Sequence, residues 1–131
     1  MTLDANSLEH TVELLDRAFN EGDLDAVLSF YEDAAVVVTE PSRLARGCSE
    51  LREFFESTIK SGLLAKQIKT RVIEADGVAL FLSRWTLTSS ESNVEMAPRA
   101  FFATTVFRKQ PDGIWKALID NPFGPLVLDA E

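Results

Sequence analysis

Residues 78–89 read VALFLSRWTLTS and residues 99–109 read RAFFATTVFRK, and these two stretches decide the fold class. Apolar side chains recur at every second position in both of them, which is the spacing of a β-strand. One face of the first stretch carries Ala79, Phe81, Ser83 and Trp85, and the opposite face begins with Val78, Leu80 and Leu82. Both faces of the expected sheet are therefore apolar, whereas an antiparallel sheet usually shows water one polar face.

The neighbouring segments continue the strand pattern. Residues 64–75 alternate moderately and are joined to the first stretch by Asp76-Gly77, a strong hairpin signal. Residues 110–113 (QPDG) predict a turn before a last strand over 114–120, and Asn121-Pro122 ends that strand. A mildly apolar tail over 123–128 follows. We therefore expect a run of antiparallel strands joined by hairpins.

The first third of the chain has helical spacing instead. The first apolar stripe is Leu8, Val12, Leu15 and Phe19. We expect Asn6 to cap this helix and Gly22 to end it, with the acidic residues between the apolar positions forming a solvated face. Asp23 caps a second helix, whose short apolar stripe is Leu24, Val27, Leu28 and Tyr31.

A strand and a third helix follow. Residues 34–39 (AAVVVT) are rich in β-branched side chains and predict a strand that ends at Pro41. We expect residues 42–47 to form a loop. A third apolar stripe at helical spacing runs from Leu51 to Ile59 and is closed by Gly62.

Helices that precede a run of hairpin-linked strands indicate an α+β fold. We expect one domain over residues 1–131, with three N-terminal helices packed on a mostly antiparallel sheet. Three helices can cover only one face of so long a sheet, so the other apolar face needs a second cover. A twin copy in a homodimer is the simplest source, and the C-terminal tail is the alternative.

Composition excludes several classes of partner. The 131 residues include 13 basic and 21 acidic ones, for a net charge of −8, which argues against binding to nucleic acid or anionic membranes. The single cysteine, Cys48, and the single histidine, His10, leave no disulfide within the chain and no multi-histidine metal site. We expect a cytoplasmic protein with no metal and no cofactor.

Several short stretches resemble the NTF2-like superfamily. Residues 19–26 (FNEGDLDA) look like its helix break, and residues 30–36 (FYEDAAV) look like the start of its first strand. Gly47 followed by LREFF at 51–55 resembles its third helix, and DGIWK at 112–116 resembles its last hairpin. The resemblance covers nearly the whole chain and is nearest to the SnoaL-like branch. It implies a strongly curved, cystatin-like cone with a pocket between sheet and helices.

Of the activities in this superfamily, ketosteroid isomerisation has the most specific requirements for side chains at the site. It needs a carboxylate base and two hydrogen-bond donors aimed at the enolate oxygen. The resemblance places Glu40 at the base, Leu15 at the first donor and Thr105 at the second. Leucine donates no hydrogen bond, and losing one such donor costs about 2.7–4 kcal/mol of transition-state stabilisation. The sequence therefore predicts no steroid isomerisation.

Two carboxyl groups remain candidates for other acid–base chemistry. Glu40 could act as a general base at an apolar pocket, or it could end an edge strand in solvent. Asp120 is the carboxyl on the late strands that could face a pocket, although strand alternation can also point it outward. Asn121 shares the alternation phase of Trp115, so we expect these two side chains to point the same way.

The expected pocket is lined mainly by large side chains, with a few polar points, as small-molecule sites usually are. The ligand-binding candidates are Leu15, Tyr31, Phe54, Phe55, Phe81, Ser83, Trp85, Phe101, Thr105, Trp115 and Asn121. The expected function is binding of a small apolar or mixed-polarity organic molecule. The alternatives are a cofactor-free acid–base enzyme of isomerase, dehydratase, cyclase or hydrolase type, and a homodimeric protein-interaction module with a vestigial pocket.

Overall fold

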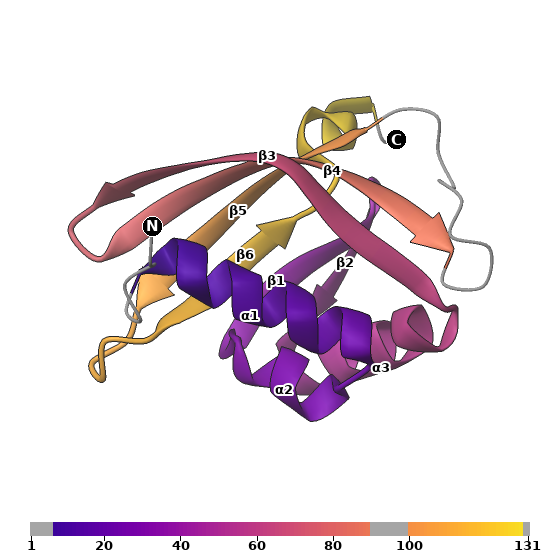
Figure 1. Cartoon of the computed structure of the whole chain (residues 1–131), viewed down its shortest axis with the longest axis horizontal. Helices are drawn as coiled ribbons and strands as arrows, with labels where there is room; N and C mark the ends of the chain where they lie inside the picture. Colours follow the sequence, from indigo (N-terminus) through magenta and orange to yellow (C-terminus); the bar gives the residue numbers. More distant parts are fainter. Residues whose placement is uncertain (1–6, 90–99, 130–131) are drawn as a thin grey trace.

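A computed structural model describes residues 7–89 and 100–129 of the chain. Three helices pack on one side of a six-stranded sheet within this part of the chain (Figure 1). The helices are α1 (Leu8–Glu21), α2 (Leu24–Ser29) and α3 (Gly47–Lys60). The strands are β1 (Tyr31–Glu40), β2 (Arg43–Arg46), β3 (Leu63–Ala75), β4 (Val78–Ser89), β5 (Phe101–Lys109) and β6 (Trp115–Asn121), and a 3-10 helix (Gly124–Asp129) follows. The predicted α+β class is confirmed.

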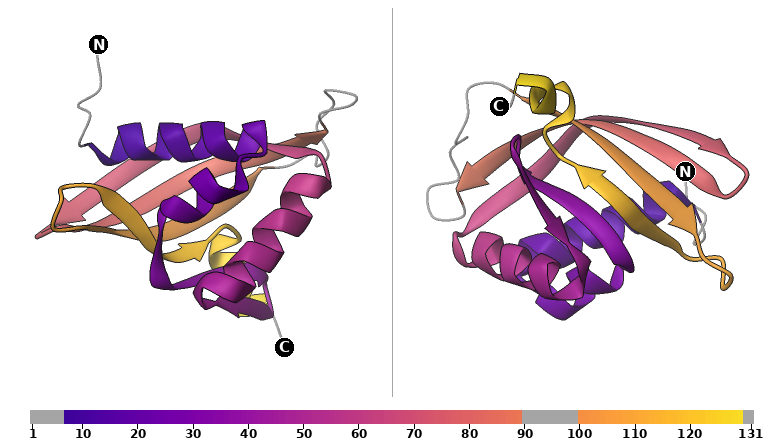
Figure 2. Two further views of the ribbon diagram at one scale, coloured as in Figure 1. Left: turned by 90° about the horizontal axis from the view of Figure 1, so that it is seen from below. Right: turned by 180° about the vertical axis from the view of Figure 1, so that it is seen from behind.

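The sheet has the strand order β2-β1-β6-β5-β4-β3. The strands are antiparallel to their neighbours except for β1 and β6, which are parallel. Helix α3 packs over β1 and helix α1 packs over β3, so these two helices lie over opposite ends of the curved sheet (Figure 2). The middle strands therefore face the space between the helices.

The ends of α1 are fixed by local hydrogen bonds. The N-cap is Ser7, whose side-chain oxygen accepts from the His10 N–H at 3.2 Å. The expected cap, Asn6, lies outside the described residues. Gly22 ends the helix in the left-handed conformation (φ 76°), which glycine adopts without steric cost. Asp23 then caps α2 by accepting from the Ala26 N–H, as predicted.

The expectation of a loop over residues 42–47 is wrong. A tight turn follows β1, and residues 43–46 return along it as the antiparallel strand β2. Gly47 is already the first residue of α3. The strand is short, lies at the edge of the sheet and has only Ala45 buried, so it lacks an apolar pattern that sequence could reveal.

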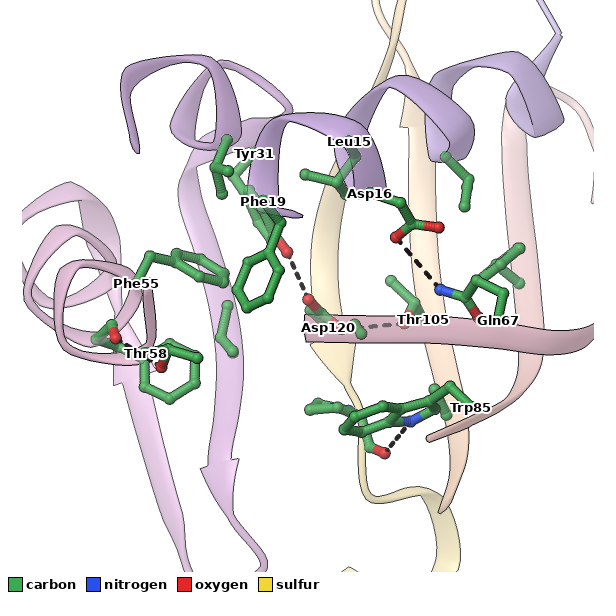
Figure 3. A pocket seen from close by; sticks show the side chains of 18 of the residues that line it. Leu15, Asp16, Phe19, Tyr31, Phe55, Thr58, Gln67, Trp85, Thr105 and Asp120 are labelled. Carbon is green, nitrogen blue, oxygen red and sulfur yellow. Dashed lines mark hydrogen bonds between the residues drawn. The ribbon is translucent and has the colours of Figure 1, made fainter. Parts of the chain in front are cut away.

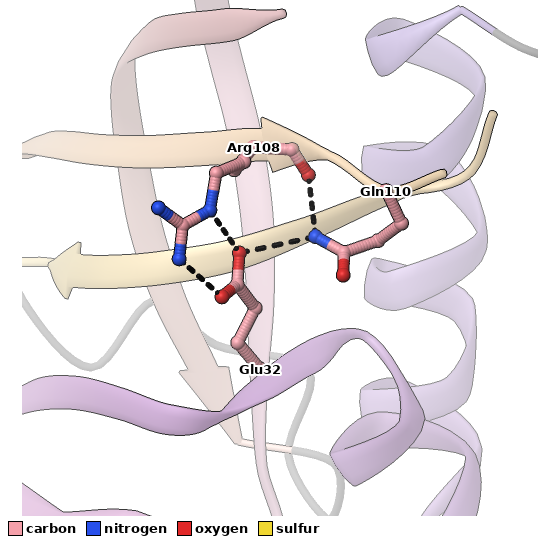
Figure 4. A network of polar contacts seen from close by, with 3 residues as sticks. All are labelled: Glu32, Arg108 and Gln110. Atoms are coloured by element: carbon pink, nitrogen blue, oxygen red, sulfur yellow. Dashed lines mark hydrogen bonds and ion pairs between the residues drawn. The ribbon is translucent and has the colours of Figure 1, made fainter. Parts of the chain in front are cut away.

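A polar cluster ties β1 to the far end of β5, across β6. Arg108 donates through Nε and Nη2 to the two carboxylate oxygens of Glu32, at 2.9 and 2.6 Å (Figure 4). Gln110 donates to the same carboxylate at 3.0 Å and to the Arg108 carbonyl at 3.0 Å. The hydrogen bonds from Arg108 hold the pKa of Glu32 below its usual value.

The face of the sheet away from the helices keeps an apolar row exposed in the single chain. Direct cross-strand pairing places five apolar side chains in line, and we call them the outer row: Ile73, Leu80, Val106, Ile119 and Val36. Ile73 is 53% exposed and Ile119 is 44% exposed. The 3-10 helix packs against β5, where Gly124 comes close to the Phe102 carbonyl, and it leaves Ile73, Leu80 and Ile119 exposed. Val36 and Val106 of the row are half-buried.

Candidate functional site

A cavity of about 330 Å³ lies between the helices and the inner face of the sheet. Its walls are mostly apolar and strongly aromatic. Phe19 of α1, Phe54 and Phe55 of α3, and Phe81 and Trp85 of β4 all line it (Figure 3). The volume falls at the lower end of the range of small-molecule sites.

The carboxyl group of Asp120 lies in the sheet wall of this cavity. Tyr31 Oη donates to Asp120 Oδ2 at 2.6 Å, and Thr105 Oγ1 donates to Asp120 Oδ1 at 3.1 Å. Thr105 stands directly opposite Asp120 in the β5–β6 pairing, and Tyr31 begins the strand on the other side of β6. Two neighbouring strands thus position the donors.

Burial dominates the electrostatics of this group. Burial raises the pKa of Asp120, while the hydrogen bonds from Tyr31 and Thr105 act in the opposite direction. The pKa of the Tyr31 hydroxyl is raised well above its usual value by burial and by the neighbouring charge of Asp120. Tyr31 therefore remains a hydrogen-bond donor at physiological pH.

A second carboxyl group, Asp16, faces the cavity from α1. Gln67 Nε2 donates to Asp16 Oδ1 at 3.4 Å (Figure 3). Gln67 Oε1 accepts a hydrogen bond from the Ser83 hydroxyl. Burial raises the pKa of Asp16 to about 6, the Gln67 hydrogen bond lowers it, and the charge of Asp120 raises it. None of the described residues that line the cavity is Lys, Arg or His.

Trp85 forms an apolar wall, although its indole is polar at one edge. The indole Nε1–H donates to the Pro122 carbonyl at 2.9 Å, so this donor is already used (Figure 3). The indole ring stacks on Phe101 with centroids 5.0 Å apart. The ring face is what Trp85 contributes to the cavity.

The structure brings most of the sequence candidates to this cavity. Those that line it are Leu15, Tyr31, Phe54, Phe55, Phe81, Trp85, Thr105 and Asp120. They come from α1, α3 and four different strands, so the fold gathers residues that are distant in the sequence.

Five candidates lie outside the cavity lining. Glu40 is exposed at the end of β1, in agreement with the solvent interpretation. Ser83 is buried and bonded to Gln67, and Phe101 lies behind Trp85. Trp115 is 2% exposed and belongs to the hydrophobic core. Asn121 donates to Thr104 Oγ1 and to the Gly124 carbonyl, so it braces the chain after β6.

The expectation that Asn121 points the same way as Trp115 is wrong because β6 contains a bulge. Phe107 pairs with Ala117, but the next residue of β5, Val106, pairs with Ile119. Leu118 is thus an extra residue, and it reverses the alternation beyond it. The bulge turns Asp120 into the cavity and turns Asn121 away from it.

Sequence reasoning missed two polar lining residues that form a hydrogen bond with each other, Asp16 and Gln67. We expected the acidic side chains of α1 to lie in solvent, yet Asp16 faces the cavity beside Phe19. The signal was available, because Asp16 lies four residues after Val12 and three before Phe19, on the apolar stripe itself. Gln67 carried no such signal, since the strand that holds it alternates only moderately.

The described residues include no group of three His, Cys, Asp or Glu side chains placed to hold a metal ion. In the same part of the chain, the helices are too short or too polar to cross a membrane.

Comparison with known proteins identifies one family. The family model of the SnoaL-like domain matches residues 12–117. No curated protein matches the chain.

Solved structures share the fold at low sequence identity. A protein of unknown function with a cystatin-like fold from Nostoc punctiforme is 16% identical, with a TM-score of 0.75 over 92% of this chain and 90% of the other. A ketosteroid isomerase-like protein from Erwinia carotovora is 24% identical, with a TM-score of 0.67 over 87% and 90%. An NTF2-like protein of unknown function from Pseudomonas putida is 17% identical, with a TM-score of 0.72 over 87% and 81%. Likeness at these identities concerns the fold alone.

Proposed function

The chain belongs to the SnoaL-like domain family, within the NTF2-like superfamily, and from this premise we propose that it binds a small, mostly apolar organic molecule in the cavity. We further propose that Asp120 and Asp16 exchange protons with that molecule. The observation that supports this function best is the carboxyl group of Asp120, buried in the wall of an otherwise apolar cavity and bonded by two hydroxyl groups. A buried carboxyl group without a charged partner costs stability, and ionisable groups of this kind in a cavity cluster at functional sites.

The walls favour a ligand that is mainly hydrocarbon. Burying apolar surface contributes roughly 0.8 kcal/mol for each CH₂ group, and aromatic walls add directional contacts with a planar ligand. The carboxyl groups of Asp16 and Asp120 give the ligand a polar end to engage. A bicyclic molecule with one polar substituent has the matching character.

The two carboxyl groups suit the roles of acid and base. Near pH 6 the carboxyl of Asp16 is partly protonated, because its pKa is raised to about that value. Burial raises the pKa of Asp120 as well, while the hydrogen bonds from Tyr31 and Thr105 favour its ionised form. We assign the role of base to Asp120, because two hydroxyl groups stabilise its carboxylate, and the role of acid to Asp16.

Ketosteroid isomerisation does not fit this arrangement. Leu15 lines the cavity and offers no donor, and the Thr105 hydroxyl is already bonded to Asp120. Glu40 is exposed and lies outside the cavity lining. We predict no turnover of a 5-ene-3-one steroid.

Binding is tested with 2-tetralone, a neutral bicyclic ketone, by isothermal titration calorimetry. Ala103→Phe places a ring in the cavity and should abolish binding, because Ala103 lines the sheet wall. Ala75→Phe is the matched control, since Ala75 is exposed at the end of β3. Equal binding of 2-tetralone to the wild type and to Ala103→Phe would contradict binding in the cavity.

Proton exchange is tested in D₂O with the same ketone. Asp120 removes a proton from the α-carbon to give the enolate, and the carboxylic acid, after exchanging with solvent, returns a deuteron. General base catalysis typically contributes about 10²–10⁴-fold. Asp120→Asn should therefore slow deuterium incorporation by at least about 100-fold while 2-tetralone still binds, as followed by NMR. Incorporation at the wild-type rate would remove Asp120 from the mechanism.

We also propose that the chain forms a homodimer through the outer row. A contiguous apolar row on a sheet face is suited to a twofold partner, because the row of one copy meets the same row of its twin. Leu80→Lys should give a monomer in sedimentation velocity, whereas Ile114→Lys, an exposed position outside the row, should not. A monomeric wild type would refute the dimer. A dimer with a cavity that binds nothing would favour the interaction-module alternative.

A further inference from the structure

We propose that the molecule held in the cavity is an apolar amine, with its protonated nitrogen bound by the carboxylates of Asp16 and Asp120. This inference rests on the proposed binding function and names the class of ligand.

The charge balance of the cavity carries the inference. Buried carboxylates are normally matched by a cation, because an uncompensated charge is expensive in a medium of low dielectric constant. The partners of Asp120 are the hydroxyl groups of Tyr31 and Thr105, and the partner of Asp16 is the amide of Gln67. All of these partners are neutral. None of the described lining residues is basic, so a cationic ligand supplies the missing countercharge.

The carboxyl groups keep acceptor capacity for such a ligand. An ionised carboxylate has about four lone-pair sites. Each oxygen of Asp120 accepts one of the hydrogen bonds described above, from Tyr31 and from Thr105. The remaining lone pairs can accept N–H groups of an ammonium, which donates up to three hydrogen bonds.

The aromatic walls agree with a cation and disfavour an anion. Phe19 and Phe55 lie beside the Tyr31–Asp120 pair, and the faces of aromatic rings attract cations (Figure 3). An anionic ligand would meet two carboxylates and negative ring faces without a described basic residue to bind it. The rest of the lining is apolar, which selects an amine on a hydrocarbon skeleton.

The preference for an amine should depend on pH. Asp16, Asp120 and Tyr31 are the titratable groups among the described lining residues, from α1, β6 and β1, and Tyr31 stays protonated. Asp16 loses its proton as the pH rises through about 6. The affinity for a cation should therefore increase over the same range, while the affinity for a neutral ligand of the same shape should not.

The test is a shape-matched series measured by calorimetry on the whole chain: tetralin, 2-tetralol, 2-aminotetralin and tetralin-2-carboxylate. At about pH 8 we expect 2-aminotetralin to bind at least about tenfold tighter than 2-tetralol, a difference of about 1.4 kcal/mol. We expect no binding of tetralin-2-carboxylate. The preference for the amine should shrink when the pH is lowered to about 5.

Variants test whether the carboxyl groups cause the preference for the amine. Asp16→Asn should reduce the ratio of amine to alcohol affinity at least about threefold. Glu13→Gln is the matched control, because it removes an exposed carboxyl from the same helix. If a variant fails to fold, the pH dependence of the amine preference of the wild type still tests the inference.

The outcomes separate this inference from the function on which it rests. If 2-tetralol binds and 2-aminotetralin binds no tighter, or if the carboxylate binds tightest, the amine inference is wrong and small-molecule binding stands. If no member of the series binds, the proposed function fails, and the inference fails with it.

Discussion

Asp16 and Asp120 are placed where ionised carboxyl groups destabilise a folded chain. Burial raises the pKa of both groups, which means that the folded state holds their protons more tightly than the unfolded state does. For such a group, the contribution to stability is complete below the unfolded pKa and is lost as the pH rises through the folded pKa. For Asp16 that window runs from 3.8 to about 6.

Asp16→Asn should remove this loss of stability. The wild type should lose up to about 3 kcal/mol of unfolding free energy between about pH 4 and about pH 7, and the variant should lose less. Urea unfolding at the two pH values measures the difference, with Glu13→Gln as control. A variant that is less stable than the wild type at neutral pH would show that Asp16 stabilises the fold.

Tyr31→Phe tests the hydrogen bond that holds Asp120. Removing the hydroxyl takes away a donor that favours the ionised carboxylate, so the pKa of Asp120 should rise further. The lost bond to a buried charged group should also cost about 2 kcal/mol of stability. Titration of the Asp120 carboxyl carbon by NMR reports the change. An unchanged or lower pKa would contradict the assigned role of Tyr31.

At the scale of single residues, sequence predicted the aromatic lining better than the polar lining. Phe54, Phe55 and Phe81 follow directly from the apolar periodicity of their elements. Asp16 lies on the apolar stripe of α1 but carries a charged side chain. Its charge led us to expect it in solvent, although its position in the stripe indicated the cavity. The side chain of Asp120 points into the cavity because of the bulge in β6. No residue type in this stretch indicates a bulge.

At the scale of elements, the strands and helices followed from periodicity and from turn residues. Gly22, Asp23 and Asp76-Gly77 marked boundaries because their backbone preferences are strong. The sequence did not predict the edge strand β2, because this strand forms by pairing with β1 and has no apolar pattern of its own. The sequence did not predict the bulge in β6 either, because the bulge is a property of the pairing with β5.

The Glu32–Arg108 pair joins two elements that are separated by β6, and its effect should depend on pH. Because the pKa of Glu32 is lowered from 4.5, its contribution to stability is complete above that pH and is lost as the pH falls through the lowered value. Glu32→Gln should therefore be less stable than the wild type at neutral pH, and the difference should fade in acid. Thermal unfolding across this range measures it. A difference that persists unchanged in acid would contradict the ionic origin.

At the scale of the whole molecule, the apolar pattern of β4 and β5 led us to expect cover on two faces of the sheet. The helices cover one face and enclose the cavity there. Arg71 and Arg84 lie on the other face beside the outer row, since they pair directly with Leu82 and Phe102.

These like charges should make the proposed dimer sensitive to salt. Salt screens repulsion between exposed charges, so the dimer should tighten as ionic strength rises from about 0.05 M to about 0.5 M. Sedimentation equilibrium over this range gives the dissociation constant. Weakening with salt would mean that attraction between opposite charges, rather than the outer row, holds the two copies together.

The central claim is that the hollow between helices and sheet receives a small organic molecule. Titration of the isotope-labelled chain with 2-tetralone, followed by NMR, tests it most directly. We predict saturable shifts at Asp16, Phe55 and the Trp85 indole, with none at Leu80 or Ile73. Shifts confined to the outer face, or no saturable shifts at all, would contradict the account.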